Sequence, residues 1–181
     1  MPTTSSELRD SQSRYQVRLH VGVSAAEVAA LAGTAHIVLV ADALDDGDAA
    51  AIPPLDGATV RVVGFRTRTR AATEVLEAQS RLGDRAVVAV VTLAGPSRPF
   101  NVEDFLVAGA VVDALAVRGI DFSSPEAAAA CAAFMSLHRA VGHLVTASAT
   151  GAEWAARGRT AEMMEACRID ADADTDVSAK A

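Results

Sequence analysis

Two continuous apolar runs constrain the fold of this chain more than any other feature. They read IVLV at residues 37–40 and AVVAVVTLAG at residues 86–95. A half-exposed strand alternates apolar and polar residues, whereas an unbroken run of branched residues is typical of a parallel strand that is covered on both faces. Neither run is long enough to cross a bilayer. The sequence therefore predicts a buried parallel sheet.

Helical patterns alternate with strand patterns along the chain. Further strands are predicted at residues 15–22 and 58–65, and helices at 24–33, 69–82, 102–119, 123–142 and 150–167. Ser24 with Glu27, and Thr150 with Glu153, have the spacing of capping boxes. HLVTAS at residues 143–148 is interpreted as a final strand. This order predicts an α/β fold with three layers, α/β/α, and a mostly parallel sheet.

Composition predicts one domain with polar ends. We expect a flexible N-terminal arm at residues 1–14, a single α/β domain at 15–169 and an acidic tail at 170–181. The net charge of -7 argues against a nucleic acid partner, because phosphate backbones need a basic face. The chain starts without an apolar signal region, and Cys131 and Cys167 lack a zinc-binding spacing. We expect a cytoplasmic protein with no membrane partner.

Aspartates follow the first apolar run, at the strand end where open α/β sheets bind ligands. Asp42 comes directly after the short segment IVLVA, and Asp45, Asp46 and Asp48 lie close behind it. Mg²⁺ prefers one or two carboxylates together with water and phosphate oxygens. Asp42 is therefore the candidate metal ligand. The three later aspartates fit a solvated turn as well as a metal site.

Arginines follow the next predicted strand. The segment GFRTRTR at residues 64–70 places Arg66, Arg68 and Arg70 just before a helix. Helix N-termini attract anions, and arginine binds phosphate or sulfonate through paired hydrogen bonds. Arg66 and Arg68 are therefore candidate substrate-binding residues. A solvated first turn, whose arginines pair with surface carboxylates, has the same pattern.

The loop after the second apolar run supplies three more candidates. Arg98 is a candidate substrate-binding residue, and Glu103 with Asp104 opens the following helix. Carboxylates beside a strand end can act as general acid, general base or metal ligand, so Glu103 and Asp104 are candidate catalytic residues. The helix dipole alone also favours acidic residues in a first turn.

Several segments together resemble the 2-phosphosulfolactate phosphatase family. They stand in the family's order between about residues 11 and 170 and read SQSRYQVRLHVG, VLVADAL, GFRTRTRAA, VEDFLVAGAVVDAL, SPEAAAACAAF and TGAEWAARG. The most specific piece is the pair Glu103 and Asp104, followed by Ala-Gly at residues 108–109. By position, Asp42 matches the Asp of the family's strand-end Asp-Val-Leu motif, and Arg66 matches the Arg of its Ser-Phe-Arg-Asn stretch.

The resemblance implies a Mg²⁺-dependent hydrolase that cleaves a small phosphate monoester carrying a sulfonate. The chain departs from the family after Asp42, where Asp45 to Asp48 replace hydroxyl and cationic residues, and PPLDGAT replaces a much longer segment. Added carboxylates repel an anionic substrate unless metal ions intervene. Two hypotheses therefore remain, a shortened phosphatase and an inactive family member that binds a small anion or a partner. Shortening also exposes apolar surface, which favours a homodimer.

Overall fold

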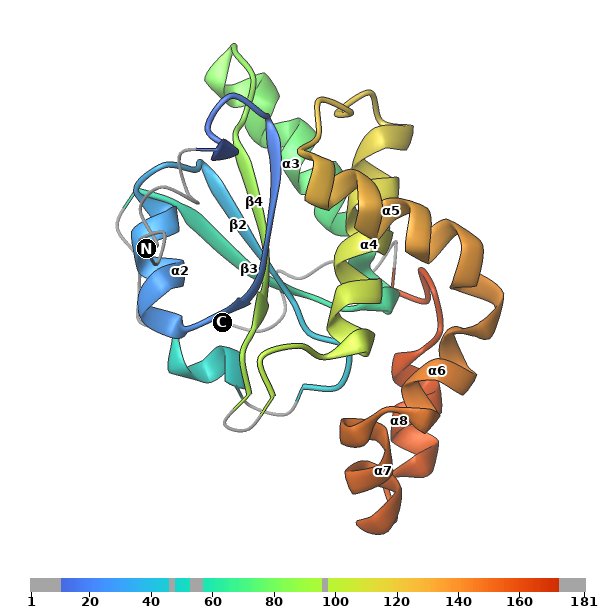
Figure 1. Cartoon of the computed structure of the whole chain (residues 1–181). Coiled ribbons are helices and arrows are strands. Elements are labelled where there is room, and N and C mark those ends of the chain that lie inside the picture. Colours follow the sequence, from blue (N-terminus) through green and yellow to red (C-terminus); the bar gives the residue numbers. More distant parts are fainter. Residues whose placement is uncertain (1–10, 46–47, 53–56, 96–97, 173–181) are drawn as a thin grey trace.

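A four-stranded, fully parallel sheet in the order β1-β4-β2-β3 forms the centre of the protein. The computed structural model describes residues 11–45, 48–52, 57–95 and 98–172. The strands are β1 (Val17–Val23), β2 (Ile37–Ala41), β3 (Thr59–Val63) and β4 (Val88–Leu93). Helices lie on both sides of the sheet (Figure 1), so the predicted three-layer α/β/α fold is confirmed.

The two inner strands are buried on both faces, as their unbroken apolar runs predict. Every residue of β2 and β4 is buried. The covering helices are α2 (Ala25–Ala32), α3 (Arg68–Leu82), α4 (Val102–Val117) and α5 (Pro125–Leu137). Leu39 and Val90 belong to the core on the side of α3, α4 and α5, whereas Val38 and Val91 belong to the core under α2. The side chains of neighbouring residues in one strand therefore point to opposite faces of the sheet.

The remaining elements lie at or beyond the carboxyl ends of the strands (Figure 1). Two short 3₁₀ helices follow strands there, η1 (Asp48–Ala51) after β2 and η2 (Phe65–Thr67) after β3. The C-terminal part of the chain contributes η3 (His138–Ala140), α6 (Val141–Ala147), α7 (Ala149–Ala156) and α8 (Thr160–Ala166). These helices extend the α5 side of the domain past the edge of the sheet.

Two local predictions for this C-terminal part are wrong. Residues 143–148, predicted as a strand, lie in α6 and the turn that follows it, where Val145 is buried. Helix α7 does not begin with a capping box at Thr150. Ser148 caps it instead and accepts a hydrogen bond from the backbone N–H of Gly151 at 3.0 Å.

Both described ends of the chain are attached to the domain. Gln12, in the expected N-terminal arm, is buried, and its side-chain amide exchanges two hydrogen bonds with the backbone of Leu19 in β1, at 2.9 and 3.0 Å. In the expected acidic tail, the backbone N–H groups of Asp170 and Asp172 each donate to a carbonyl of η2 at 3.0 Å. The tail therefore begins as a segment docked beside the end of β3.

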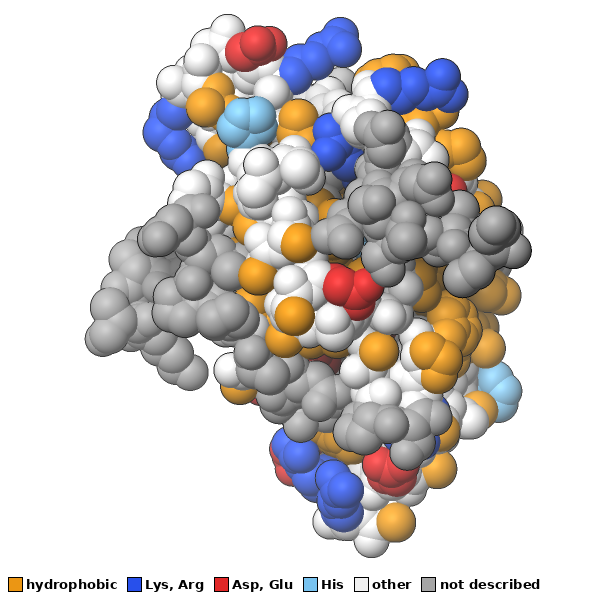
Figure 2. All heavy atoms as spheres, turned by 60° about the vertical axis from the view of Figure 1, so that its left-hand side comes forward, with side chains coloured by type: hydrophobic (Ala, Val, Ile, Leu, Met, Phe, Trp, Pro, Cys, Tyr) orange, Lys and Arg blue, Asp and Glu red, His pale blue; other side chains and the backbone are white. Residues whose placement is uncertain are grey.

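One stretch among the described residues, Pro125–Ala147, is long and apolar enough to cross a membrane by length and composition. It comprises α5, η3 and α6, and a single stretch of this kind is weak support for a membrane span. On the face drawn in Figure 2, Lys and Arg side chains gather toward the two ends of the molecule, with apolar and uncharged side chains prominent between them. The visible basic side chains of that face do not form one continuous patch.

Candidate functional site

A cavity of about 810 Å³ opens at the carboxyl ends of β2 and β3, where the sequence predicts a site. Asp42 and Arg66 both line it, and the backbone N–H of Asp42 donates to the carbonyl of Val63 at 3.0 Å, which joins the two strand ends. The wall consists of Asp42, Ala43, Leu44, Asp45, Ala49, Ala50, Val62, Gly64, Arg66, Thr67, Trp154, Glu162, Glu165, Ala166 and Asp172. It therefore combines an apolar surface with several charged groups.

Asp42 shapes the loop that follows β2. Its Oδ1 accepts hydrogen bonds from the backbone N–H groups of Leu44, at 3.0 Å, and Asp45, at 2.8 Å. Asp45 has a φ of 43°, a left-handed conformation that aspartate tolerates better than most residues. Part of the aspartate run thus forms a turn held by Asp42, as one hypothesis predicts. Asp46 and the side chain of Asp48 lie outside the part of the chain that the structure describes.

Asp104 lies behind this turn, at the start of α4. Its Oδ1 accepts a hydrogen bond from the backbone N–H of Ala43 at 2.9 Å, and its Oδ2 accepts one from Asn101 at 3.3 Å. The pKa of Asp104 is raised to about 7, first by burial and then by the nearby charges of Asp42 and Glu103. The hydrogen bonds from the Ala43 N–H and from Asn101 oppose the rise. Asp104 can therefore gain or lose a proton close to neutral pH.

Asp104→Asn is expected to change how stability depends on pH. A carboxyl whose pKa is raised by folding stabilises the fold below its unfolded pKa, about 3.9, and this contribution is lost as pH rises through about 7. Without divalent metal, urea unfolding from pH 4 to 8 should show a wild-type loss on the order of 3 kcal/mol that Asp104→Asn lacks. Parallel curves for the two proteins would contradict the assigned shift.

Glu103 is the most buried of the predicted site residues. Only 3% of its surface is exposed, and its charge contributes to the raised pKa of Asp104. Neither Glu103 nor Asp104 lines the cavity, although Asp104 contacts the Asp42 turn through Ala43. In this conformation Asp104, and not a residue of the cavity wall, holds the turn from behind.

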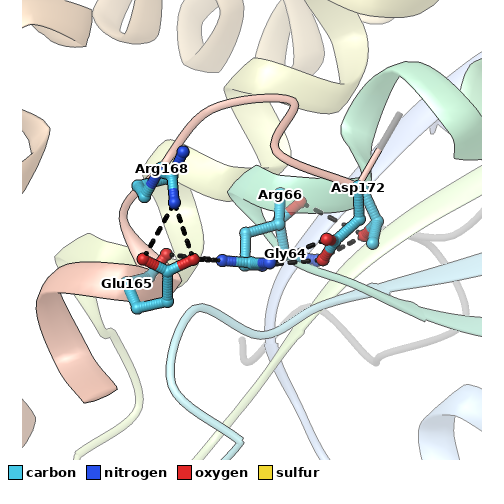
Figure 3. Close-up of polar contacts among 6 residues, drawn as sticks. Gly64, Arg66, Glu165, Arg168 and Asp172 are labelled. Carbon is cyan, nitrogen blue, oxygen red and sulfur yellow. Dashed lines mark hydrogen bonds and ion pairs between the residues drawn. The ribbon is translucent and has the colours of Figure 1, made fainter. Parts of the chain in front are cut away.

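Two carboxylates from the C-terminal part of the chain hold Arg66 (Figure 3). Its Nε and Nη2 donate to the two carboxylate oxygens of Asp172, both at 2.7 Å. Its Nη1 donates to the carboxylate of Glu165, which also accepts from Arg168 at 3.0 Å. These hydrogen bonds from Arg66 hold the pKa values of Asp172 and Glu165 below their usual range. The paired edge of this guanidinium is therefore occupied by an internal anion.

The other predicted arginines lie outside the cavity wall. Arg68 donates to Asp113 of α4 at 2.6 Å and to Asp170 at 2.9 Å, so it joins two helices to the C-terminal segment. Arg98 donates to Glu153 of α7 at 3.0 Å. The structure thus brings Asp42 and Arg66 to one cavity and places Asp104 beside it, while Arg68 and Arg98 take part in contacts between elements.

The charge balance of the cavity is acidic. Among its described lining residues, five side chains are carboxylates and one is an arginine. The described residues contain no group of three or more His, Cys, Asp or Glu side chains arranged to hold a metal ion. A Mg²⁺ site needs fewer protein ligands than three, because this ion is commonly held by one or two carboxylates together with water and substrate oxygens. Asp42 and Asp45 at the cavity wall meet that smaller requirement.

Sequence reasoning missed the contribution of the C-terminal helices to the cavity. Trp154, Glu162, Glu165 and Asp172 line it together with the strand ends. Arg66 and Asp172 are 106 residues apart in the chain. The one available signal was the concentration of aspartates after residue 169 in an otherwise apolar half, which fits a partner for the arginines of residues 66–70.

Comparison of the chain with the profiles of known protein families and with curated proteins finds no match. The resemblance to the 2-phosphosulfolactate phosphatase family therefore stays a prediction from the motifs. Because one fold can host many functions, the function has to be argued from the site itself.

Proposed function

We propose that the protein is a Mg²⁺-dependent phosphatase that hydrolyses a small phosphate monoester carrying a sulfonate or carboxylate. The observation that carries the proposal is that Asp42 and Arg66 line one cavity at the carboxyl ends of neighbouring parallel strands. A carboxylate for a metal ion and a guanidinium for an anion are the two groups that such a substrate needs. The position at the strand ends is the usual one for ligands of open α/β sheets.

Four of the predicted site residues have a role under this proposal, whereas Arg68 and Arg98 lie outside the cavity wall. Asp42, with Asp45 beside it, would hold Mg²⁺, which when bound polarises the phosphoryl group and activates water. Arg66 would bind the second anionic group of the substrate. Asp104 keeps the Asp42 turn in place through Ala43 and can carry a proton near neutral pH. The charge of the buried Glu103 helps to raise the pKa of Asp104. The apolar wall around Trp154 would limit the access of water.

A second candidate is a non-enzymatic protein that binds a small anion or a partner. It is favoured by the ion pairs of Arg66, Arg68 and Arg98, each of which already contacts a carboxylate of the same chain. It is also favoured by the excess of carboxylates in the cavity, which disfavours a substrate with several negative charges. The predicted homodimer and cytoplasmic location are compatible with both candidates.

Release of inorganic phosphate tests the proposal. Purified protein would be assayed with 2-phosphosulfolactate and with glycerol 3-phosphate, which lacks the sulfonate and the carboxylate, with Mg²⁺ and with EDTA. We expect turnover that requires Mg²⁺ and favours the sulfonated substrate, because Arg66 then has a second anion to bind. A folded protein that releases no phosphate from either compound would contradict the proposal and favour the binding candidate.

A further inference from the structure

Asp172 occupies the edge of Arg66 that a ligand anion would use. We infer that its carboxylate is an internal competitor, which closes over Arg66 and has to leave before a phosphate, sulfonate or carboxylate of a ligand can bind there. The nature of the natural ligand rests on the proposed function. The competition itself rests on the contacts of the described residues.

The contact has the geometry of bound substrate anions. Two parallel hydrogen bonds of 2.7 Å join Nε and Nη2 of Arg66 to the two oxygens of Asp172 (Figure 3). Arginine binds external carboxylates and phosphates through the same paired edge. Arg66 and Asp172 also line the same cavity, so the pair sits at the proposed binding site. Asp172 thus imitates a ligand of that site.

The segment that carries Asp172 has a separate anchor two residues earlier. The carboxylate of Asp170 accepts hydrogen bonds from Nε of Arg68, at 2.9 Å, and from the backbone N–H of Thr69, at 3.1 Å, at the start of α3. Arg68 also binds Asp113 and is only 17% exposed in its side chain, whereas the side chain of Asp172 is 32% exposed. The side chain of Asp172 can therefore rotate away from the Arg66 guanidinium while Asp170 stays docked and the backbone N–H of Asp172 stays on the Arg66 carbonyl, at 3.0 Å.

Glu165 keeps Arg66 in position during such an exchange. It binds Nη1, the nitrogen that Asp172 does not use, and is itself held by Arg168. Departure of Asp172 would then free the Nε and Nη2 edge without releasing the guanidinium. An exposed ion pair is weak, but the carboxylate is tethered beside its partner. A contact closed about nine tenths of the time lowers the apparent affinity for an external anion about tenfold.

Phosphate binding to full-length variants tests this competition. Isothermal titration with inorganic phosphate would compare the wild type with Asp172→Asn and with Glu162→Gln. Glu162 also lines the cavity but pairs with Arg159 instead of Arg66, so its variant removes the same charge without opening the paired edge. We expect Asp172→Asn to lower the Kd about tenfold, and Glu162→Gln to change it about twofold.

A double variant tests whether the tighter phosphate binding of Asp172→Asn comes from Arg66. Adding Arg66→Gln to Asp172→Asn should remove the improvement, because the freed edge no longer exists. Equal affinities for Asp172→Asn and Glu162→Gln would overturn the inference and assign the effect to general charge. An unchanged Kd in Asp172→Asn would also overturn it. Tighter phosphate binding without phosphatase activity would support the inference while contradicting the proposed function, so the two fail separately.

Discussion

Gly109→Ala is expected to cost about 3 kcal/mol or more of unfolding free energy, enough to unfold a marginal domain. Gly109 lies within α4 where α5 crosses it closely. A Cβ atom at this position would lie 2.1 Å from the backbone carbonyl oxygen of Ala130 and 2.9 Å from Cβ of Phe134. The first of these is a backbone atom, so only a shift of α4 or α5 could relieve the clash.

Urea unfolding followed by circular dichroism measures this effect. Gly33→Ala is the matched control, because a Cβ there meets only the Ala30 carbonyl at 3.5 Å, an ordinary contact, and its φ is -67°. We expect the control to stay within about 0.5 kcal/mol of the wild type. If Gly109→Ala were as stable as the control, the close approach of α4 and α5 would be wrong.

Asp42→Asn is expected to lower Mg²⁺-dependent phosphate release at least about a hundredfold. A metal ion supplies several kcal/mol of transition-state stabilisation, and about 1.4 kcal/mol corresponds to a factor of ten. The substitution keeps the shape of the side chain, so its oxygen can still accept from Leu44 and Asp45 and the turn should persist. The loss would then reflect the missing charge.

Two further readings separate a lost metal ligand from a damaged fold. The pKa of Asp104 should fall in Asp42→Asn, because the charge of Asp42 helps to raise it. Asp121→Asn, which removes one exposed carboxylate after α4, should leave activity unchanged within about twofold. Activity of Asp42→Asn within about threefold of the wild type would remove Asp42 from the metal site.

Much of the architecture follows from local patterns in the sequence. The unbroken runs of β2 and β4 predict strands covered on both faces, and the structure buries every residue of both. The capping box of Ser24 with Glu27 is confirmed, with hydrogen bonds in both directions. Such signals succeed because a few adjacent residues determine them.

The failures come from signals that are locally ambiguous. Residues 143–148 combine residues that favour strands with a length that also fits a short helix, and contacts with the neighbouring helices decide for α6. Thr150 and Glu153 have capping-box spacing, but Ser148, two residues earlier, also has a capping side chain and is the residue that caps α7. Sequence spacing alone does not rank two such caps.

The candidate site was partly predictable for a geometric reason. The carboxyl ends of parallel strands meet at one edge of the sheet, so the sequence alone indicates that Asp42 and Arg66 lie near each other. The partners of the arginines could not, since Asp172 and Glu165 reach Arg66 from about 100 residues away, with separations of 106 and 99. A charged side chain in the sequence does not reveal whether an external anion or an internal carboxylate will bind it.

The most direct test of the central claim is to locate where phosphate binds. Amide chemical shifts of ¹⁵N-labelled protein would be followed during titration with inorganic phosphate in the presence of Mg²⁺. The account predicts saturable shifts that are largest at Leu44, Asp45 and Gly64, around the cavity between β2 and β3. The account would be contradicted by shifts centred on residues 19–23, which line a separate cavity of about 320 Å³, or by no saturable shifts.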